Sequence, residues 1–187
     1  MKRIAIGMTG ASGVIYGVRV LQVLREDPGV ETHLILSRNA RNTLPRETDW
    51  SVAAVEELAD ACHDPEDLAA PLASGSFPTD GMAVVPCSVR ALSSISHSYN
   101  AELLTRAADV TLKEGRPLVL VPREAPLHRG HLRLLLDAAE LGAVILPPMV
   151  AFYHQPKSVA QVVDQTVGKV LDQLGVEHTL FRRWSGG

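Results

Sequence analysis

The first residues whose types and spacing could bind a ligand lie in a run of small residues near the amino terminus, Gly7-Met-Thr-Gly-Ala-Ser-Gly13. The run separates a predicted strand, Arg3–Gly7, from a predicted helix, Ile15–Arg25. Small residues there let backbone amides and the Ser12 hydroxyl approach an anion at a helix N-terminus. The run is not G-x-G-x-x-G, and the next strand ends in Ser37 instead of an acid, which favours a mononucleotide phosphate or other small anion. A tight strand–helix turn without a ligand is the alternative.

Two later strand ends carry polar side chains as well. Ser88 follows the predicted strand Met82–Val85, either as a phosphate ligand or as a plain helix N-cap. Arg123 and Glu124 follow the predicted strand Pro117–Val121. The arginine can bind a phosphate with two donors, and the glutamate can accept a proton or orient a cation. A surface ion pair is the other interpretation of these two residues.

A fifth predicted strand, Val144–Leu146, leads into the proline-rich and aromatic segment Pro147–Pro156. Its Tyr153 can hydrogen-bond an anion, and a simple linker is the alternative. Cys87 is expected to be a packing residue, because no base can be placed beside it from the sequence. The tail His178–Gly187 is expected to dock on the protein because it carries aromatic residues.

The elements that must position these residues alternate between short apolar runs and stretches with helical spacing. One more strand is predicted at Thr32–Leu36, and His63–Asp80 is predicted to be a loop region. Further helices are predicted at Val52–Ala61, Ala91–Ile95, Leu103–Lys113, His131–Leu141 and Val159–Leu174. Strands that are apolar throughout and alternate with helices predict a parallel sheet covered on both faces, a three-layer α/β/α fold. Because ligands bind at the carboxyl ends of such strands, the polar strand ends are expected to meet there.

Composition narrows the class of protein further. A chain of 187 residues predicts one domain, residues 1–187, and a net charge of −3 provides no basic field for nucleic acid. The apolar runs are too short to span a membrane, and Gly7 interrupts the start too early for a secretory signal. Two cysteines, Cys62 and Cys87, make no disulfide framework, so a reducing cytoplasm is expected. The histidines and cysteines show no metal-binding spacing, so no metal is expected.

Over nearly the whole chain, the sequence resembles the UbiX-type flavin prenyltransferases. Within that family it most resembles the small flavoprotein component of the phenolic acid decarboxylase systems. The resemblance is carried by Met8–Gly13, His33–Ser37, Pro86-Cys-Ser88, Arg106–Val110, Leu112–Glu114, the highly specific block Arg116–Leu127, Gly142–Val144, Phe152–Pro156 and Arg182-Arg-Trp184.

This resemblance implies a flavodoxin-like, Rossmann-like sheet and a homo-oligomer, commonly a dodecamer. It implies transfer of a dimethylallyl group from dimethylallyl monophosphate to N5 of reduced FMN, with ring closure at C6 and no metal. The product is a prenylated FMN cofactor that a separate UbiD-type decarboxylase uses.

The resemblance also assigns roles to individual residues. The residues that match flavin-contacting positions are Gly10, Ala11, Ser12, Ser37, Ser88, Val89, Arg90, Ala91, Arg106 and Arg123. The residues that match positions holding the dimethylallyl phosphate are Lys113, Arg123, Glu124, Tyr153 and Lys169. Glu47 matches an acid near the reacting centre, and Trp184 matches an aromatic over the pocket. The catalytic set is then Glu47, Lys113, Arg123 and Glu124, with the departing phosphate or Glu124 accepting a proton.

Three residues depart from the family pattern. Ala91 replaces a threonine, Glu102 replaces an asparagine, and Leu68 stands where some members have a tryptophan. The first two motivate an alternative function, a non-catalytic flavin carrier or accessory subunit. A second alternative is a flavin-dependent decarboxylase of peptidyl cysteine, which shares the fold.

Overall fold

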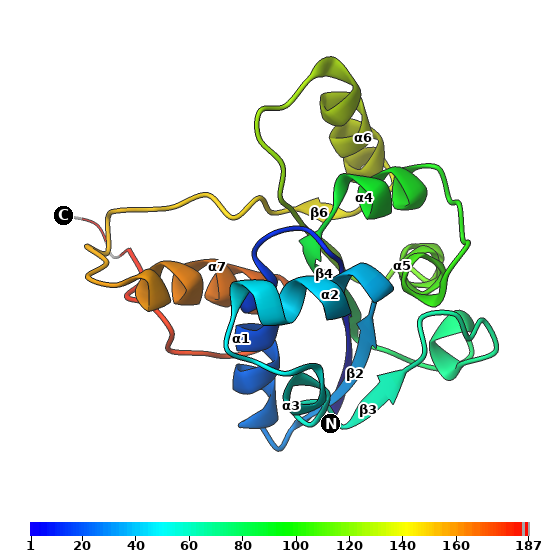
Figure 1. Cartoon of the computed structure of the whole chain (residues 1–187), viewed down its shortest axis with the longest axis horizontal. Helices are drawn as coiled ribbons and strands as arrows, with labels where there is room; N and C mark the ends of the chain where they lie inside the picture. Colours follow the sequence, from blue (N-terminus) through cyan, green and yellow to red (C-terminus); the bar gives the residue numbers. More distant parts are fainter. Residues whose placement is uncertain (185, 187) are drawn as a thin grey trace.

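The computed structural model describes residues 1–184 and 186, and these form a parallel six-stranded sheet in the order β3-β2-β1-β4-β5-β6 (Figure 1). The strands are β1 (Lys2–Met8), β2 (Val30–Leu36), β3 (Ala61–His63), β4 (Gly81–Cys87), β5 (Leu118–Pro122) and β6 (Val144–Ile145). The helices are α1 (Val14–Arg25), α2 (Arg38–Glu47), α3 (Val52–Glu56), α4 (Val89–Ser96), α5 (Leu103–Lys113), α6 (Arg129–Glu140) and α7 (Val159–Gln173), with a short 3-10 helix η1 (Pro71–Ala73).

Apolar side chains project from both faces of the sheet into two cores, which explains why the strands are apolar throughout. On β1, Ile4 and Ile6 enter one core, while Ala5 between them enters the other. The same alternation on β5 sends Val119 to the first core and Leu120 to the second. Successive side chains of a strand point to opposite faces, so a sheet covered on both sides needs no polar positions.

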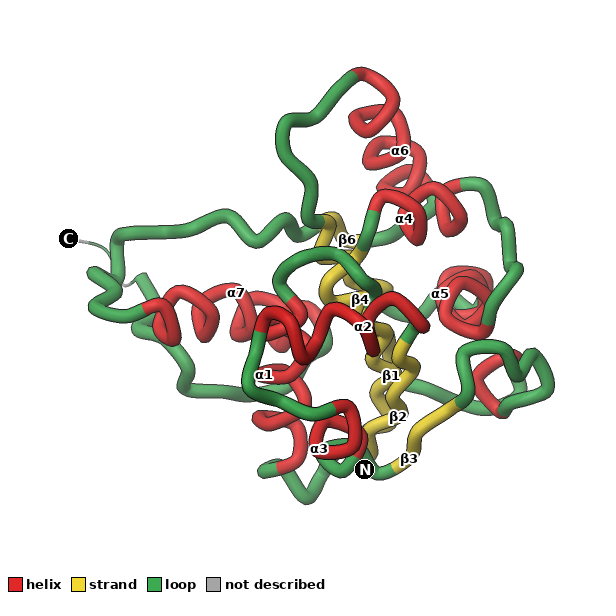
Figure 2. The backbone as a smooth tube through the Cα atoms, viewed as in Figure 1, coloured by secondary structure: helices red, strands yellow, loops and turns green. Residues whose placement is uncertain are grey.

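Helices cover each face and confirm the predicted three-layer α/β/α fold (Figure 2). α1 and α7 pack against each other and contribute Leu21 and Val167 to the first core. α4 and α5 contribute Leu92 and Leu104 to the second core, and α6 packs against α4. Of the predicted helices, Leu103–Lys113 coincides with α5, and α7 begins where predicted.

Two differences from the prediction lie between β2 and β4. The sequence does not predict α2, because Arg38–Glu47 is mostly polar, contains Pro45 and buries only Ala40 and Leu44. The predicted helix Val52–Ala61 is too long, since α3 ends at Glu56 and the chain then joins the sheet as β3. β3 pairs with β2 from His33 to Ile35 and forms the edge of the sheet, so tertiary pairing overrides the helical pattern there.

The strand ends meet at one edge of the sheet, as the sequence predicts for parallel strands. Pro122 of β5 pairs with Cys87 of β4, and the backbone amide of Thr9 donates to the carbonyl of Pro86. Beyond β6, residues 146–158 run without regular structure to the start of α7, away from the sheet (Figure 1). We call residues 146–158 the arm and residues 176–184, which return along α7, the tail. Within the described residues, no helix has both the length and the apolar character needed to cross a membrane.

Candidate functional site

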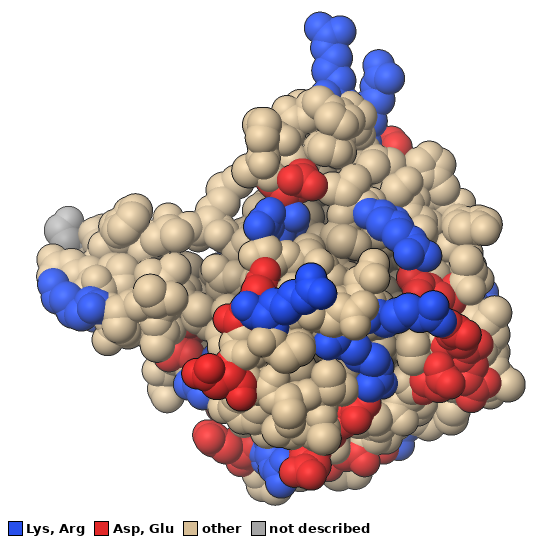
Figure 3. Space-filling model, in the orientation of Figure 1, with Lys and Arg blue, Asp and Glu red and all other residues tan. Residues whose placement is uncertain are grey.

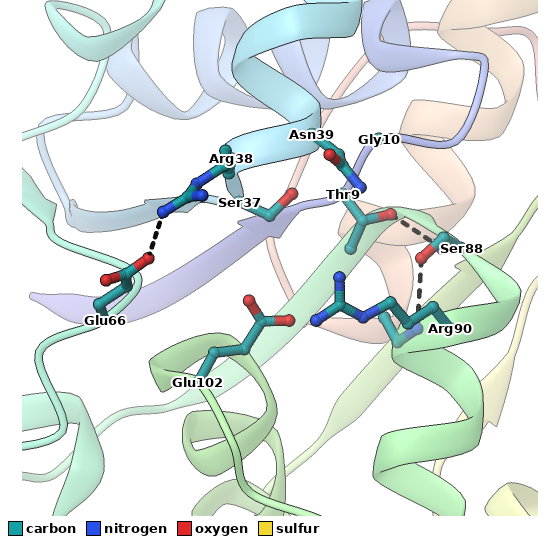
Figure 4. A pocket seen from close by; sticks show the side chains of 10 residues that line it. Thr9, Gly10, Ser37, Arg38, Asn39, Glu66, Ser88, Arg90 and Glu102 are labelled. Atoms are coloured by element: carbon teal, nitrogen blue, oxygen red, sulfur yellow. Dashed lines mark hydrogen bonds and ion pairs between the residues drawn. The ribbon is translucent and has the colours of Figure 1, made fainter.

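A pocket of about 260 Å³ lies at the carboxyl edge of the sheet (Figure 4). Three helix starts line it: Ser37 is the N-cap of α2, Ser88 the N-cap of α4, and Glu102 the N-cap of α5. Each helix start offers backbone amides that have no partner inside the helix, together with the positive end of the helix dipole. The pocket is therefore suited to an anion such as a phosphate.

The glycine-rich run lies against α2 and forms another wall of the pocket. A Cβ on Gly10 would come within 2.4 Å of the Asn39 Cβ, so only glycine allows this approach. Gly13 adopts a left-handed φ of 100° before α1, and its amide donates to Oε2 of Glu47 at 2.8 Å. Glu47, predicted to lie near the reacting centre, is thus placed beside this run.

The two serines cap their helices and still have a proton to donate. Oγ of Ser37 accepts from the Ala40 amide at 3.2 Å, and Oγ of Ser88 accepts from the Ala91 amide at 3.2 Å. The Ser88 amide donates to Oγ1 of Thr9 at 2.8 Å, which fixes the start of α4 to the end of β1. A hydroxyl that accepts a capping bond keeps its own O–H, so capping and ligand binding are compatible.

The charged side chains of the pocket divide into a paired and an unpaired set. Arg38 and Glu66 form an ion pair of 2.8 Å at the rim. Arg90 and Glu102 form no hydrogen bond or ion pair through their side chains with any residue in 1–184 or 186. Figure 4 shows these two side chains entering the pocket from opposite sides and pointing toward one another.

The structure brings most of the predicted flavin-contact residues together. Five of them line the pocket: Gly10, Ser37, Ser88, Arg90 and Ala91. Ala11 and Ser12 continue the glycine-rich run, and Val89 is the first residue of α4. Arg123 lies at the same sheet edge, because its amide donates to the carbonyl of Cys87 at 3.1 Å. Glu124 follows it, exposed, and accepts from the Ala125 amide at 3.0 Å.

Two predicted residues lie away from this pocket within the chain. α5 begins at the pocket and runs back across the sheet, and eleven residues make a helix about 16 Å long. Lys113 is its last residue, exposed and ion-paired with Glu114, whose pKa it lowers. Arg106 is half-buried on the same helix, where its guanidinium donates to the Ala73 carbonyl at 3.1 Å and pairs with Asp109. Within a single chain Lys113 and Arg123 thus lie at opposite edges of the sheet, and their sharing of one phosphate stays a prediction.

The remaining predicted residues belong to the arm, α7 and the tail. Tyr153 of the arm meets Trp184 of the tail edge to face, with ring centroids 6.0 Å apart. Lys169 of α7 lies 3.7 Å from Asp172, which also binds Arg183 of the tail at 2.7 Å. The nearby Arg183 guanidinium lowers the pKa of Asp172. The tail is docked on α7, as the sequence predicts for the described part of His178–Gly187; Ser185 and Gly187 lie outside the described residues.

The sequence does not predict several of the residues that line the pocket. Arg38 and Asn39 line it because α2, the unpredicted helix, begins there. Ser37 followed by a polar stretch is an N-cap signal that could have located this helix start. Glu66 reaches the pocket from the long loop after β3, where no local pattern indicates it. Thr9 and Glu102 also line it, and the sequence marks Glu102 only as a departure from the family pattern.

Cys87 is a packing residue, as predicted. It is fully buried, and burial raises the pKa of its thiol to about 12, so almost no thiolate is present at neutral pH. Among the described residues, no group of three or more histidine, cysteine or acidic side chains is arranged to hold a metal ion.

Comparison with known proteins agrees with this geometry. Residues 1–173 match the Flavoprotein family. The chain is 58% identical over 188 residues to the flavin prenyltransferase UbiX of Escherichia coli strain K12, with both chains covered in full.

Two solved structures extend the match to the backbone. One is AnUbiX (PadA1) in complex with FMN and dimethylallyl pyrophosphate, which shares 47% identity and a TM-score of 0.97 over 100% of this chain and 98% of that one. The other is a dodecameric FMN-dependent UbiX-like decarboxylase from Escherichia coli O157:H7, with 51% identity and a TM-score of 0.96 over 98% and 100%. The sequence resemblance is thereby confirmed, and this chain belongs to the UbiX-type flavin prenyltransferase family of flavoproteins.

Proposed function

We propose that this chain transfers a dimethylallyl group from dimethylallyl monophosphate to reduced FMN, making prenylated FMN for a UbiD-type decarboxylase. One observation carries the proposal: three helix starts and the glycine-rich run converge on one pocket, which fits the phosphate of a mononucleotide. Reduced FMN supplies the nucleophilic N5 and the C6 to which the five-carbon unit is joined. The chain's own residues bind and orient the two phosphates and keep water out.

The amides at the starts of α2 and α4, with Ser37 and Ser88, hold the FMN phosphate in this proposal. Arg123, Tyr153, Lys169 and Lys113 hold the phosphate of the donor. Breaking the allylic C–O bond places negative charge on that phosphate, and fixed cations stabilise such charge as it develops. Glu124 or the departing phosphate accepts the proton released on ring closure, and Glu47 stays beside the glycine-rich run.

The donor site is completed by a neighbouring copy of the chain in a homo-oligomer of the dodecameric kind. Lys113 is exposed and Arg106 is half-buried on α5, both away from the pocket of their own chain, and a second chain can present them to another copy's pocket. The pocket of one chain, at about 260 Å³, is also smaller than the roughly 300–1,000 Å³ usual for such ligands. Figure 3 shows few charged side chains on the projecting left part of the molecule, where the arm and tail lie (compare Figure 1), and Met149 and Phe152 of the arm are more than 70% exposed.

Residues 1–187 form one flavin prenyltransferase domain in this proposal, and the protein works in the cytoplasm. Both cysteines are free, which suits a reducing compartment.

The direct test is to incubate the purified protein with reduced FMN and dimethylallyl monophosphate without oxygen, and to measure the mass of the flavin. A flavin heavier than FMN by one isoprene unit supports the proposal. FMN that is bound but unchanged supports the non-catalytic carrier instead. A parallel reaction with dimethylallyl diphosphate determines which ester is the donor.

Completion of the site by a second copy has its own test. Lys113→Ala and Arg123→Ala chains are each expected to be inactive, and co-expression should restore activity. Restoration follows because some sites then take Lys113 and Arg123 from two chains that each retain one of them. If the mixed oligomers stay as inactive as the two variants alone, the two residues do not reach one site from different copies.

A further inference from the structure

Glu102 carries a charge into the pocket, and none of its contacts within the described residues gives that charge a structural role. It lies at the N-cap of α5 but makes no capping hydrogen bond. Within residues 1–184 and 186 it accepts no hydrogen bond and forms no ion pair through its side chain, whereas Glu66 at the rim is neutralised by Arg38. Arg90 points toward Glu102 from the opposite side of the pocket (Figure 4) and likewise has no ion-pair partner among the residues that the structure describes.

A bound phosphate and Glu102 make opposite demands on this pocket. The helix starts and Arg90 attract an anion, and two of the starts carry serine hydroxyls that can donate to it. Glu102 brings a fixed negative charge to the same space and offers Arg90 another acceptor. Like charges a few ångströms apart repel one another even near the protein surface, where solvent weakens the interaction.

We infer that Glu102 is a specificity-determining residue that limits how tightly the pocket holds the flavin phosphate, and so speeds release of the prenylated product. The inference rests on the proposed function, because it takes FMN as the ligand. Prenylation leaves the phosphate of the flavin unchanged, so Glu102 opposes the product as it opposes the acceptor. An enzyme whose product is a cofactor for another protein must let that product go.

The experiment compares the full-length protein with Glu102→Gln, which removes the charge and keeps the size. Kd and the dissociation rate are measured by flavin fluorescence for FMN and for riboflavin, which lacks the phosphate. Glu102→Gln is expected to bind FMN about tenfold more tightly, mostly through slower dissociation, and riboflavin with unchanged affinity. The gain for FMN should shrink as salt is added, because ions screen the repulsion.

Controls separate this role from the alternatives. Glu57→Gln removes the same charge from an exposed site outside the pocket and should leave FMN binding unchanged. Glu102→Asn keeps a residue that caps helices well, so it should reproduce the gain if Glu102→Gln folds poorly. In an Arg90→Gln background part of the gain should disappear, because competition for that guanidinium is then removed, and the part due to repulsion of the phosphate should remain.

Two results would overturn the inference. If Glu102→Gln weakens FMN and riboflavin by the same factor, the carboxylate accepts a hydrogen bond from the flavin and supports binding. If neither affinity changes, the carboxylate lies outside the reach of the phosphate. In both cases the unmodified protein still binds FMN, so the proposed function stands; failure of the unmodified protein to bind FMN would remove both.

Discussion

The pocket and the arm–tail region both carry residues assigned to ligands, but they are held in place by different parts of the chain. In the pocket, most of the groups that are held in place belong to the backbone. The Ser88 amide is bound by Thr9, the Gly13 amide by Glu47, and Gly10 lies in close contact with α2. Thr9, Ser37 and Ser88 of the pocket directly follow the buried strands β1, β2 and β4, so the pocket is fixed by the same core that stabilises the sheet.

In the arm–tail region, one side chain does much of this work. Asp172 of α7 binds Arg183 and His178 of the tail, and lies 3.7 Å from Lys169. Trp184 follows Arg183 directly and meets Tyr153 of the arm. The comparison teaches that the pocket is preorganised before any ligand arrives, whereas the aromatic pair and Lys169 depend on the few contacts of one side chain, Asp172, which a single substitution can weaken.

Gly10→Ala should give the largest effect, because it strikes the backbone of the pocket. The new Cβ would lie 2.4 Å from the Asn39 Cβ and 2.9 Å from the Asn39 carbonyl carbon, so α2 must move. We expect a stability loss of about 1–3 kcal/mol and loss of most FMN binding. Urea unfolding and flavin titration measure the two effects.

Adding Asn39→Gly to Gly10→Ala removes one of the two clashing atoms and should recover part of both losses. If Gly10→Ala alone binds FMN like the unmodified protein, the contact between the glycine-rich run and α2 does not position the ligand.

Asp172→Asn should give the next largest effect, confined to the donor side. It weakens the hold on Arg183 and on the tail, so Tyr153, Trp184 and Lys169 lose their fixed positions. We expect a stability loss of about 1 kcal/mol, because Arg183 is mostly exposed and solvent weakens the pair. KM for the dimethylallyl ester should rise by about tenfold, while the Kd of FMN stays constant.

Asp164→Asn is the matched control for this prediction. Asp164 lies on the same helix and binds Arg19 at 2.7 Å with similar exposure, but Arg19 belongs to α1 and not to the tail. Its substitution should cost similar stability and leave KM unchanged. Equal rises in KM for the two variants would show that α7 as a whole, and not the tail, sets donor binding.

The same contrast explains how far the sequence predicts this protein. Alternation of apolar strands and helices predicts the sheet, and parallel strands must place Ser88 and Arg123 at one edge. α5 coincides with its prediction because its apolar spacing is strong. α2 lacks such spacing, and it is held by the glycine-rich run and the core through Leu44, contacts that are distant in sequence.

The donor residues show where sequence reasoning stops. Resemblance assigns Lys113 and Arg123 to one phosphate, but it does not say which chain supplies each. The direction of α5, which runs back from the pocket edge, takes Lys113 to the far end of the helix. Pairing of the tail with Asp172 also has no local signal, since a long-range ion pair leaves no periodic pattern in the sequence.

A smaller effect on stability is expected when the pH is lowered, because of a histidine on the edge strand β3. Burial and the neighbouring His33 lower the pKa of His63 on β3, and its Nε2 lies 2.9 Å from Nδ1 of His33. The pKa of this histidine is lower in the folded protein than in the unfolded chain, where it is about 6.5. Its contribution to stability is therefore complete above about pH 6.5 and is lost as the pH falls through the pKa of the folded state. Between about pH 7.5 and about pH 5.5, stability should therefore fall, by less than about 1 kcal/mol from this partly exposed ring.

His63→Asn should remove this part of the acid loss, as measured by urea unfolding at both pH values. His97→Asn replaces an exposed histidine at the C-cap of α4 and should leave the loss as it is. An identical pH dependence in His63→Asn and the unmodified protein would contradict the assignment to the His33–His63 pair.

The smallest effect on the ligand should come from Cys87→Ala, one residue from the pocket. Cys87 and Ser88 are neighbours at the end of β4, but the thiol is fully buried with a pKa of about 12, whereas the Ser88 hydroxyl caps α4 and borders the pocket. Cys87→Ala should therefore keep FMN binding and turnover within about twofold, with a stability loss of about 1 kcal/mol for the lost packing. Ser88→Ala should weaken FMN binding and cost about 0.5–2 kcal/mol of stability as a lost cap. Loss of turnover in Cys87→Ala with FMN binding intact would make the thiol a reacting group and move the chemistry from the pocket surface into the core.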